Sequence, residues 1–590
     1  MRLADYLVET LADLGIDTVF MVTGRGALFL TDAVAKSRRL RVVCTHHEQS
    51  AAFAAGAQAQ LENRLSACMV STGCASTNAM TGVLNAWQDG LPVVFISGQN
   101  ILSETSYHTG INVRTFGQQE ANIIELVRPI TKYAVMVTDP KQIRRQLEEA
   151  VYLANSGKKG PVWVDVPLDL QSAQIEPEEL EGFVPGADPV IATDVPLESL
   201  RAVLRDARRP VVLVGSGVRS ANRIAEFESF VEVNQLPVVY SASAVDVYPL
   251  SRTLAVGSLG AMGCSRAGAF AVQNADCVLV LGNRLSTLTT GVDFCKFARE
   301  ARVIVVDIDE VEHRKNDLRI DDLVLQPLEE FFARVGEDRL TGDTSEWVSK
   351  CMHWKARFSR ESAFASTDRI DLYDLAGALS KQLDGDAVVV TDSGFIEVIL
   401  PTNLDFGPRR RAIHPVSQGS MGFAVPAILG AGFSGRQVVA VVGDGSFMMN
   451  MQELEAIRAH RLPVKLIVVN NNAYAIIRRR QRELFRNRTI GTDPGNGVTI
   501  PDFARVADLF GFAYQRIETP GELDAGIEAL IRTPGPVICE VLGKDDQEYV
   551  EVAHAKGANG KFVRRPLEDQ YPFLDRDVFL SEMIVAPIDQ

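Results

Sequence analysis

The sequence has few cysteines, few tryptophans and no long apolar run, and each scarcity excludes a class of protein. Its 590 residues include eight cysteines, scattered without a CxxC pair, so neither a disulfide scaffold nor a metal–thiolate site is expected. No apolar stretch approaches the roughly 20 residues that a membrane-spanning helix needs. The first residues, MRLADYLVETLADLG, have the pattern of an acidic amphipathic helix rather than of a signal peptide. We therefore expect a cytoplasmic protein with reduced cysteines.

Positive charge is also in deficit. The chain has 60 Lys and Arg against 75 Asp and Glu, a net charge of −15, which argues against nucleic acid or an anionic membrane as a partner. The apolar content of 46% and charged content of 23% are typical of globular protein. The length suits three or four domains.

Short β-rich runs alternate with helical patterns, which predicts an α/β protein built from three doubly wound parallel-sheet domains. The predicted segments are a first domain (1–170), a linker (171–197), a middle domain (198–335), a polar helical connector (336–368), a third domain (369–545) and a tail (546–590). The tail is polar and contains proline, so we expect it to wrap the surface or cover a site.

The most informative stretch is 438–480. An apolar run over 438–442 predicts a buried parallel strand, and it ends in the glycine turn around Asp444. A helical pattern and a Leu-Pro break lead to a second apolar run, 464–469, which ends in three asparagines. Ligands of open α/β sheets bind at the carboxyl ends of such strands.

The side chains at these two strand ends suit magnesium and phosphate. Asp444 and Asn471 supply oxygen ligands of the kind that Mg²⁺ prefers. Gly443 and Gly445 would let the backbone approach a ligand, and Ser446 adds a hydroxyl for phosphate. The alternative is an ordinary turn, and a lone GDG is weak; the full GDG–helix–LP–NN spacing is more specific.

That spacing resembles the thiamine diphosphate (ThDP) enzymes, most closely their acetolactate synthase-like branch. The resemblance implies a Mg²⁺ ion held by Asp444, Asn471 and the carbonyl of Ala473. It also implies that the first domain binds the pyrimidine of ThDP and the third its diphosphate, usually from different subunits. We therefore expect a homodimer or homotetramer with active sites at subunit interfaces, and a middle domain with a nucleotide-binding-like fold.

An internal echo links the first and third domains. SACMVSTG leads through a helical stretch to LPVVFISGQN, and VVAVVGDG leads in the same way to LPVKLIVVNNN. Two copies of one ancestral unit would explain this pattern, with the first copy having lost the Asp–Asn metal pair. Convergence on a common βαβ rhythm is the alternative.

Glu48 is the candidate catalytic residue. It follows the predicted strand RVVCTH and opens an Ala-rich helix. A first-turn acid also favours the helix dipole, which is the structural alternative, but an acid in an apolar setting can have its pKa raised into a range useful for proton transfer. His47-Glu48-Gln49 matches the family motif HEQ, and the resemblance implies that Glu48 hydrogen-bonds the pyrimidine nitrogen of ThDP.

The segment SQGSMGFAVP resembles the family pattern GxMGxxxP. By that resemblance Met421 bends the cofactor and the carbonyl of Gly419 accepts from its amino group; the alternative is that Met421 is a core residue. The resemblance also places Asn78, Ser393 and Ile476 among the cofactor contacts.

The middle domain offers glycine turns and an acid at strand ends, the features that a dinucleotide requires. The residues are Gly215, Gly217, Arg284 and Asp307. In acetolactate synthases the matching segments bind FAD, which has no redox role in the main reaction, whereas other branches keep the fold and lose the flavin. Because family positions after Arg284 are altered here, FAD is expected on the resemblance alone.

The substrate side departs from acetolactate synthase. Arg480 stands where those enzymes have a tryptophan, and the loop before Gln119 is longer than usual. Together with Arg25 and His108, these residues suggest a larger or more anionic acceptor than pyruvate, because arginine pairs naturally with phosphate or carboxylate. The alternative is a set of solvated surface residues, which we expect for Arg478 and Arg479.

We therefore expect a ThDP-dependent carboligase that decarboxylates a 2-oxo acid, with pyruvate as the expected donor, and transfers the two-carbon acyl unit to a second carbonyl. The tail RRPLEDQYPFLDRDVFLSEMI resembles carboligases of branched-sugar biosynthesis, so the acceptor could be a ketone or a nucleotide-activated keto sugar. The alternatives are a true acetolactate synthase, a 2-oxo acid decarboxylase, a ThDP hydrolase or oxidase and, remotely, a non-catalytic paralogue.

Overall fold

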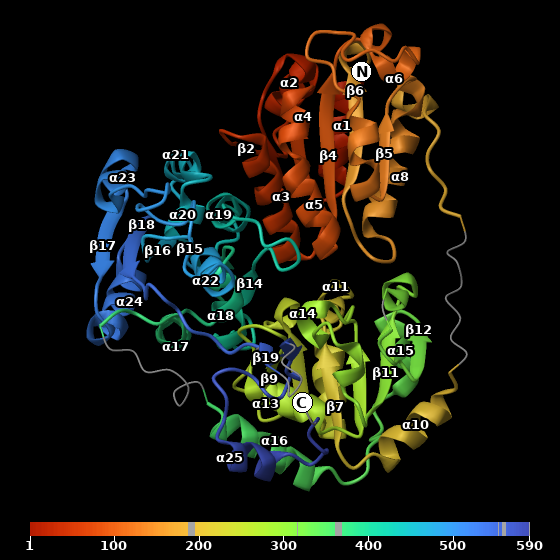
Figure 1. Cartoon of the computed structure of the whole chain (residues 1–590). Helices are drawn as coiled ribbons and strands as arrows, with labels where there is room; N and C mark the ends of the chain where they lie inside the picture. The colour runs from red at the N-terminus through yellow and green to blue at the C-terminus, as the bar shows by residue number, and fades with distance from the viewer. Residues whose placement is uncertain (187–194, 316, 360–367, 553, 557–561, 589–590) are drawn as a thin grey trace.

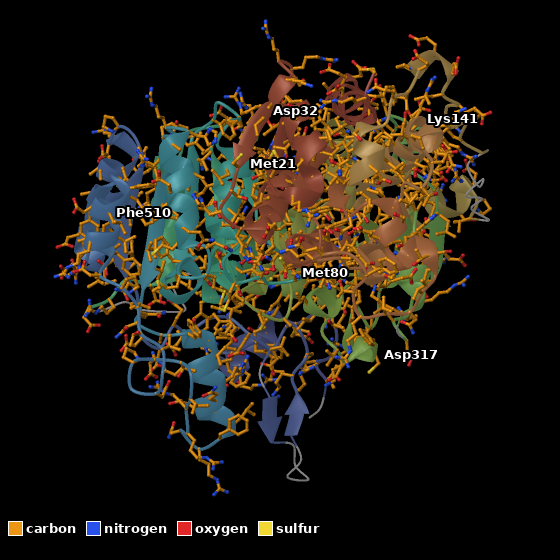
Figure 2. The ribbon with its side chains drawn as sticks, turned by 90° about the horizontal axis from the view of Figure 1, so that it is seen from above. Met21, Asp32, Met80, Lys141, Asp317 and Phe510 are labelled. Carbon is orange, nitrogen blue, oxygen red and sulfur yellow. The ribbon has the colours of Figure 1, made fainter. Side chains whose placement is uncertain are left out.

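Three six-stranded parallel sheets with flanking helices build the chain (Figure 1). The computed structural model describes residues 1–186, 195–315, 317–359, 368–552, 554–556 and 562–588. The predicted fold class is confirmed, since each sheet belongs to one of the three expected α/β domains. Viewed from above, the first domain, which carries Met21, Asp32, Met80 and Lys141, lies beside the third, which carries Phe510 (Figure 2).

The first domain has the strand order β2-β1-β3-β4-β6-β5. Its strands are β1 (Thr18–Met21), β2 (Arg41–Cys44), β3 (Ser66–Val70), β4 (Val93–Gln99), β5 (Tyr133–Met136) and β6 (Val162–Pro167). Its helices are α1 (Leu3–Asp13), α2 (Leu28–Lys36), α3 (Glu48–Glu62), α4 (Cys74–Asn78), α5 (Met80–Asp89), α6 (Ser106–Thr109), α7 (Ile123–Val127), α8 (Ile143–Asn155) and α9 (Leu168–Ser172).

The middle domain has a different order, β12-β11-β10-β7-β8-β9, which counted within the domain is the 3-2-1-4-5-6 order of dinucleotide-binding folds read from the other side. Its strands are β7 (Pro210–Val214), β8 (Val238–Ser241), β9 (Ala255–Leu259), β10 (Cys277–Leu281), β11 (Arg302–Asp307) and β12 (Asp322–Leu325). Its helices are α10 (Leu197–Asp206), α11 (Gly217–Ser220), α12 (Ile224–Asn234), α13 (Arg266–Gln273), α14 (Thr287–Thr290), α15 (Leu328–Val335) and α16 (Ser345–Arg357).

The third domain has the order β14-β13-β15-β16-β18-β17. Its strands are β13 (Val388–Thr391), β14 (Arg411–Ile413), β15 (Val438–Gly443), β16 (Lys465–Asn470), β17 (Ala513–Ile517) and β18 (Val537–Leu542). Its helices are α17 (Leu372–Gln382), α18 (Phe395–Asn403), α19 (Ala424–Ala431), α20 (Asp444–Phe447), α21 (Leu454–Ala459), α22 (Ala475–Leu484), α23 (Phe503–Phe510) and α24 (Leu523–Arg532).

The first and third sheets have the same strand order, as the internal echo predicts. Each first-domain strand corresponds to the third-domain strand whose number is twelve higher, so β3 corresponds to β15 and β4 to β16. The predicted counterpart of the Asp444 turn therefore follows β3, at Ser71 to Gly73, and the counterpart of the asparagines follows β4. Position in the sheet, beyond local sequence likeness, supports a duplicated unit.

The two corresponding helices α3 and α19 pack directly on each other. The rings of Phe53 and Phe423 meet edge to face, with centroids 5.4 Å apart. Close approach depends on small residues, because a side chain on Gly430 would begin 2.2 Å from the carbonyl oxygen of Ala54. The Ala-rich sequence of α3 thus builds the contact between the first and third domains.

The tail lies on the middle domain (Figure 1). It contains the antiparallel pair β19 (His554–Lys556) and β20 (Phe562–Arg564) and the helix α25 (Arg576–Glu582). Buried Glu582 accepts from Lys350 at 2.6 Å and from the indole of Trp354 at 2.8 Å, both on α16. The connector and the tail therefore pack together against the middle domain.

One buried ion cluster joins all three domains. Arg411 of β14 places its Nε 2.7 Å from Asp246 Oδ2 in the middle domain, and Arg219 lies 3.1 Å from the same carboxylate. Arg411 also donates to the backbone carbonyls of Gln60 and Leu61, at the end of α3 in the first domain. We call Asp246, Arg219 and Arg411 the junction cluster.

Candidate active site

The predicted metal ligands meet at the carboxyl ends of two neighbouring strands. Asp444 follows β15 and Asn471 follows β16, and these strands pair in parallel register. The Asp444 carboxylate accepts backbone N–H groups from Gly445 at 2.7 Å, Asn471 at 3.1 Å and Ala473 at 3.3 Å. The N–H of Ala473 also donates to the Asn471 side-chain oxygen at 3.2 Å. The parallel register therefore brings the two motifs into one cradle.

Burial makes this cradle suitable for a cation. Asp444 is 2% exposed, and burial raises its pKa to about 6, although backbone N–H donors oppose the rise. A divalent ion would reverse that shift by stabilising the carboxylate. Carboxylate, amide and carbonyl oxygens suit Mg²⁺. The described residues contain no group of three or more His, Cys, Asp or Glu that could hold a metal, so a metal here would need Asn471, backbone and cofactor oxygens.

Gly445 and Ser446, two of the predicted cofactor contacts, stabilise the cradle itself. A side chain on Gly445 would begin 1.9 Å from the ring of Tyr474, so the glycine is required by Tyr474 itself. The hydroxyl of Ser446 hydrogen-bonds Asp392, which makes it a brace of the loop. Gly443 is open, with only the tip of Ile396 at 3.8 Å, and Ile476 is partly buried on α22.

Asp392 is a residue that the sequence interpretation missed. It is fully buried at the end of β13 and accepts backbone N–H groups from Ser393 at 2.8 Å, Gly422 at 3.1 Å and Ala424 at 2.7 Å. Through Ser446 it also reaches the Asp444 turn. Asp392 thus ties the glycine loop to the metal turn; the acid immediately before Ser393, at the end of an apolar strand, was the available signal.

The glycine loop of Gly419 and Met421 lies between the third and first domains. Gly419 and Gly422 have φ values of +61° and +81°, in the left-handed region. The N–H of Ser417 donates to Asp89 of α5 at 3.1 Å, while Met421 is partly exposed. Contact with the first domain therefore fixes this loop.

Glu48 opens α3, as predicted, and accepts from the Asn78 side chain at 2.9 Å. Glu48 is partly exposed and Asn78 is exposed. Neighbouring residues hold the helix start to the third domain: Ser50 bonds Asn450 at 3.1 Å, and the N–H of His46 donates to buried Glu453 at 3.0 Å. Glu48 and Asn78, both predicted site residues, are thus brought together on an accessible edge.

The proposed acceptor residues of the first domain gather at its strand ends, except for His108. Arg25 donates to Gln118, and both line a cavity of about 30 Å³ with Gln119, Thr72 and other residues. The backbone oxygen of Gln119 lies 2.0 Å from the side-chain position of Gly73. The long loop therefore sits directly on the first domain's counterpart of the Asp444 turn.

His108 lies apart from this cavity, exposed on α6. The loop that carries it is held by buried Glu120, which accepts from Ser106 Oγ at 2.6 Å and from Phe116 N at 2.8 Å. The loop is therefore a folded unit.

The arginines of α22 are paired with acids. Arg480 bonds Glu551 and the Tyr549 hydroxyl, both at 2.8 Å, and Arg479 bonds Glu551 at 2.6 Å. Arg478 is 7% exposed and donates to the carbonyl of Asp545 at 2.7 Å. The expectation that Arg478 and Arg479 are solvated was therefore wrong, because the segment after β18 covers them.

Two of the residues proposed to hold FAD, Gly215 and Gly217, do not present free backbone donors. The N–H groups of Gly215 and Gly217 donate to the carbonyls of Leu281 and Gly282, each at 3.0 Å. A hollow of about 590 Å³ in this domain lies instead at the amino ends of β10 and β11. Gly215 and Gly217 contact the backbone after β10 directly, at the point between β7 and β10 where the strand order reverses. Their N–H groups are therefore already engaged and do not form a phosphate site there.

The other two residues are also engaged. Asp307 accepts from Ile308 N at 2.7 Å and lies 3.1 Å from the ring of buried His313. Arg284 is exposed and donates to Ser417 of the third domain at 3.2 Å. Asp307 and Arg284 therefore both have partners within the protein.

Comparison with known proteins agrees with this arrangement of domains. The thiamine pyrophosphate enzyme N-terminal TPP binding domain matches residues 1–126, the central domain 197–328 and the C-terminal TPP binding domain 392–541. The acetolactate synthase large subunit of Corynebacterium glutamicum is 31% identical over 98% of this chain and 92% of its own length. The chain belongs to the thiamine pyrophosphate enzymes, in their acetolactate synthase-like branch.

Other relatives in this branch align along most of their length. The acetolactate synthase large subunit of Haemophilus influenzae is 28% identical over 96% of this chain and 99% of its own. Probable acetolactate synthase 2, chloroplastic, of Oryza sativa is 31% identical over 94% and 85%. The chain is thus a ThDP-dependent carboligase, an enzyme that forms carbon–carbon bonds. Within the described residues, no helix of this ThDP enzyme is both long and apolar enough to span a membrane.

Proposed function

We propose that this carboligase decarboxylates a small 2-oxo acid, pyruvate by preference, and joins the two-carbon unit to a second carbonyl compound. The observation that carries the proposal is the cradle in which Asp444, Asn471 and Ala473 share hydrogen bonds at one sheet edge. Bound ThDP supplies an electron sink for decarboxylation. The chain supplies binding, orientation and proton movement.

In this proposal the third domain holds the diphosphate through Mg²⁺. Asp444 and Asn471 provide side-chain oxygens and Ala473 its carbonyl. Asp392 keeps the glycine loop and the metal turn in register, since it accepts N–H groups from that loop and bonds Ser446 of the turn. Gly419 and Met421 then face the ring system, as the resemblance implies. Preorganisation of this kind reduces the cost of ordering the cofactor.

Glu48 holds the proton that the cofactor ring exchanges. Its hydrogen bond from Asn78 fixes the carboxylate at the start of α3. The decisive test is release of carbon dioxide from pyruvate, with and without added ThDP. Undiminished release by Glu48→Ala would refute the role of Glu48.

The working enzyme is proposed to be a homodimer, or a homotetramer, with each site shared between two chains. Glu48 and Asn78 are accessible at the edge of the first domain, and within the described residues no hydrogen bond or ion pair joins them to Asp444. Exposed apolar side chains gather around the third-domain cradle, as a subunit contact requires; they are Met448, Met449, Ile477, Leu484 and Phe485. A second copy would cover them and bring its Glu48 to this chain's cradle.

The acceptor is proposed to be a ketone bearing an anionic group, such as a nucleotide-activated keto sugar. The support is Arg480 beside the cradle on α22, Arg25 at the first-domain cavity and the tail resemblance. The relatives are acetolactate synthases, so pyruvate as acceptor is the second candidate. Products identified by mass spectrometry separate the cases: acetolactate means synthase, acetaldehyde means decarboxylase, and a branched product from a panel of ketones supports the proposal.

FAD and a cytoplasmic location stay predictions. The middle-domain strand order is that of nucleotide-binding folds, but its predicted contacts are engaged elsewhere. The visible absorbance of the purified protein tests for flavin directly.

A further inference from the structure

The first turn of α18 connects the two ends of the cofactor cradle. Ile396 reaches to within 3.8 Å of the side-chain position of Gly443, beside the metal turn. The next residue, Glu397, places its Oε2 3.3 Å from the side-chain position of Gly419, in the glycine loop. Glu397 therefore lies at the end of the cradle where the cofactor rings belong, away from the diphosphate end.

The carboxyl group of Glu397 is unlike every other acid of the site. Glu48 accepts a hydrogen bond from Asn78, and Asp444 and Asp392 accept hydrogen bonds from backbone N–H groups. In the part of the chain that the structure describes, no hydrogen bond or ion pair reaches Glu397. Its oxygens are consequently free for a substrate.

The charges that face Glu397 favour its protonated form. They are Asp89 of α5 in the first domain and Asp392 at the end of β13. Burial, and then these two acids, raise the pKa of Glu397 well above its ordinary value. The Arg284 cation acts on Asp89 and bonds Ser417. A carboxyl group in such a place is biased toward its protonated form, the form that can donate a proton.

We propose that Glu397 is the proton donor of the bond-forming half of the reaction. The inference rests on the carboligase function proposed above. As the two-carbon unit bonds to the carbonyl carbon of the acceptor, the π electron pair moves to the acceptor oxygen, which takes the proton from Glu397. The resulting carboxylate then removes the hydroxyl proton of the two-carbon unit as the product ketone forms and its bond to the cofactor breaks. Glu397 is thereby reprotonated, and this bond-forming half of the reaction consumes no net proton.

The test is Glu397→Gln, which keeps size and a hydrogen-bond donor but cannot transfer the proton. A general acid typically contributes about 10²–10⁴-fold, so formation of the ligated product should fall about 100-fold or more. The rate of carbon dioxide release in the first turnover, measured by rapid quench, should change less than about 3-fold, because that turnover precedes the bond-forming half. The affinity for ThDP, measured by calorimetry, should stay within about 3-fold of wild type, because the substitution keeps an uncharged side chain of the same size at this position.

A readout without cofactor or turnover accompanies the kinetics. The infrared spectrum of the unloaded protein should show the carbonyl band of protonated carboxylic acids at neutral pH, and Glu397→Gln should lower its intensity by that of one group. Glu397→Asp should restore part of the ligation rate. Glu455→Gln, on the surface of α21, is the matched control and should change neither the band nor the product ratio.

The outcomes separate this inference from the function on which it rests. Wild-type ligation by Glu397→Gln, an equal loss of both half-reactions, or lost ThDP affinity would each overturn the proton-donor role. Absence of ThDP-dependent carbon dioxide release from the wild type would overturn the proposed function. Unchanged intensity of the carboxylic acid band in Glu397→Gln would show that Glu397 does not carry the proton and would overturn the inference alone.

Discussion

The guanidinium of Arg480 lies 2.8 Å from the Glu551 carboxylate, and this ion pair fastens the helix after the metal loop to the segment after β18. Arg479 bonds the other oxygen of Glu551 at 2.6 Å and lies over the Tyr549 ring. Glu551 is 7% exposed. The arginine that replaces the family's tryptophan is therefore positioned by a buried acid.

Glu551→Ala should destabilise the protein more than Arg480→Ala. Loss of the acid leaves two arginines with Glu483 alone and the buried Tyr549 hydroxyl without its carboxylate acceptor, which costs about 3 kcal/mol. Loss of Arg480 leaves Glu551 paired with Arg479. Because the Arg480 side chain is 40% exposed, its loss should lower the free energy of unfolding by about 1 kcal/mol. Midpoints of urea unfolding measure both. Equal effects would contradict the view that Glu551 organises the pair.

Two inactive chains should complement each other if the site is shared. Glu48→Ala and Asp444→Ala should each abolish turnover, but a heterodimer of the two keeps one intact pair. Random mixing after dissociation should restore about a quarter of wild-type activity, because half the dimers are mixed and each has one working site. Glu48→Ala mixed with itself is the control. No recovery in verified heterodimers would contradict a shared site.

Gly445→Ala should damage the cradle before any ligand binds. Its added carbon would lie 1.9 Å from the Tyr474 ring, whereas the carbon added by Gly443→Ala meets only Ile396 at 3.8 Å. The melting temperature of the unloaded protein should fall for Gly445→Ala by several degrees, as expected for overpacking of about 1–3 kcal/mol. Gly443→Ala should leave it unchanged. The ThDP affinity of the Gly443→Ala variant then reports whether the backbone at Gly443 approaches the diphosphate.

Acid should weaken the junction cluster. Burial alone would raise the pKa of Asp246, but Arg219 and Arg411 outweigh it and lower the pKa to about 2. Because the folded-state pKa is depressed, the stabilisation is present above the unfolded value near 4 and is lost as the pH falls to about 2. The shift corresponds to about 2 kcal/mol for this side chain, which is 6% exposed.

Asp246→Asn should remove that part of the acid sensitivity. The variant should unfold at lower urea than wild type at pH 7, and the difference should shrink between about pH 4 and pH 2. Asp508→Asn, on the exposed side of α23, is the matched control and should follow the wild type. A constant difference across this range would show that the cluster does not depend on the charge of Asp246.

Strand prediction succeeded for most central strands and missed most edge strands, although the edge strand β2 was predicted and the central strand β8 was not. The apolar runs that became β3, β15 and β16 are buried along almost their whole length. The missed strands include β5 (YAVM) and β17 (AYQRI), which are partly exposed edge strands. Edge strands bury little apolar surface, so no continuous apolar run distinguishes them from loops.

The sequence by itself determined the cofactor side of this protein. Asp444 and Asn471 lie at the ends of apolar runs, and parallel pairing of those runs brings them together whatever the rest of the chain does. Local spacing is sufficient for such a site because each ligand is fixed by the strand that precedes it.

Only the tertiary structure decided the surroundings of Asp392, Glu397 and Arg480. Each depends on a segment far along the chain: the glycine loop, α5 of the first domain and the segment after β18. Burial and the sign of the neighbouring charges then determine whether an acid accepts backbone N–H groups, keeps its proton or forms an ion pair. Those quantities arise from packing, so no motif spacing contains them.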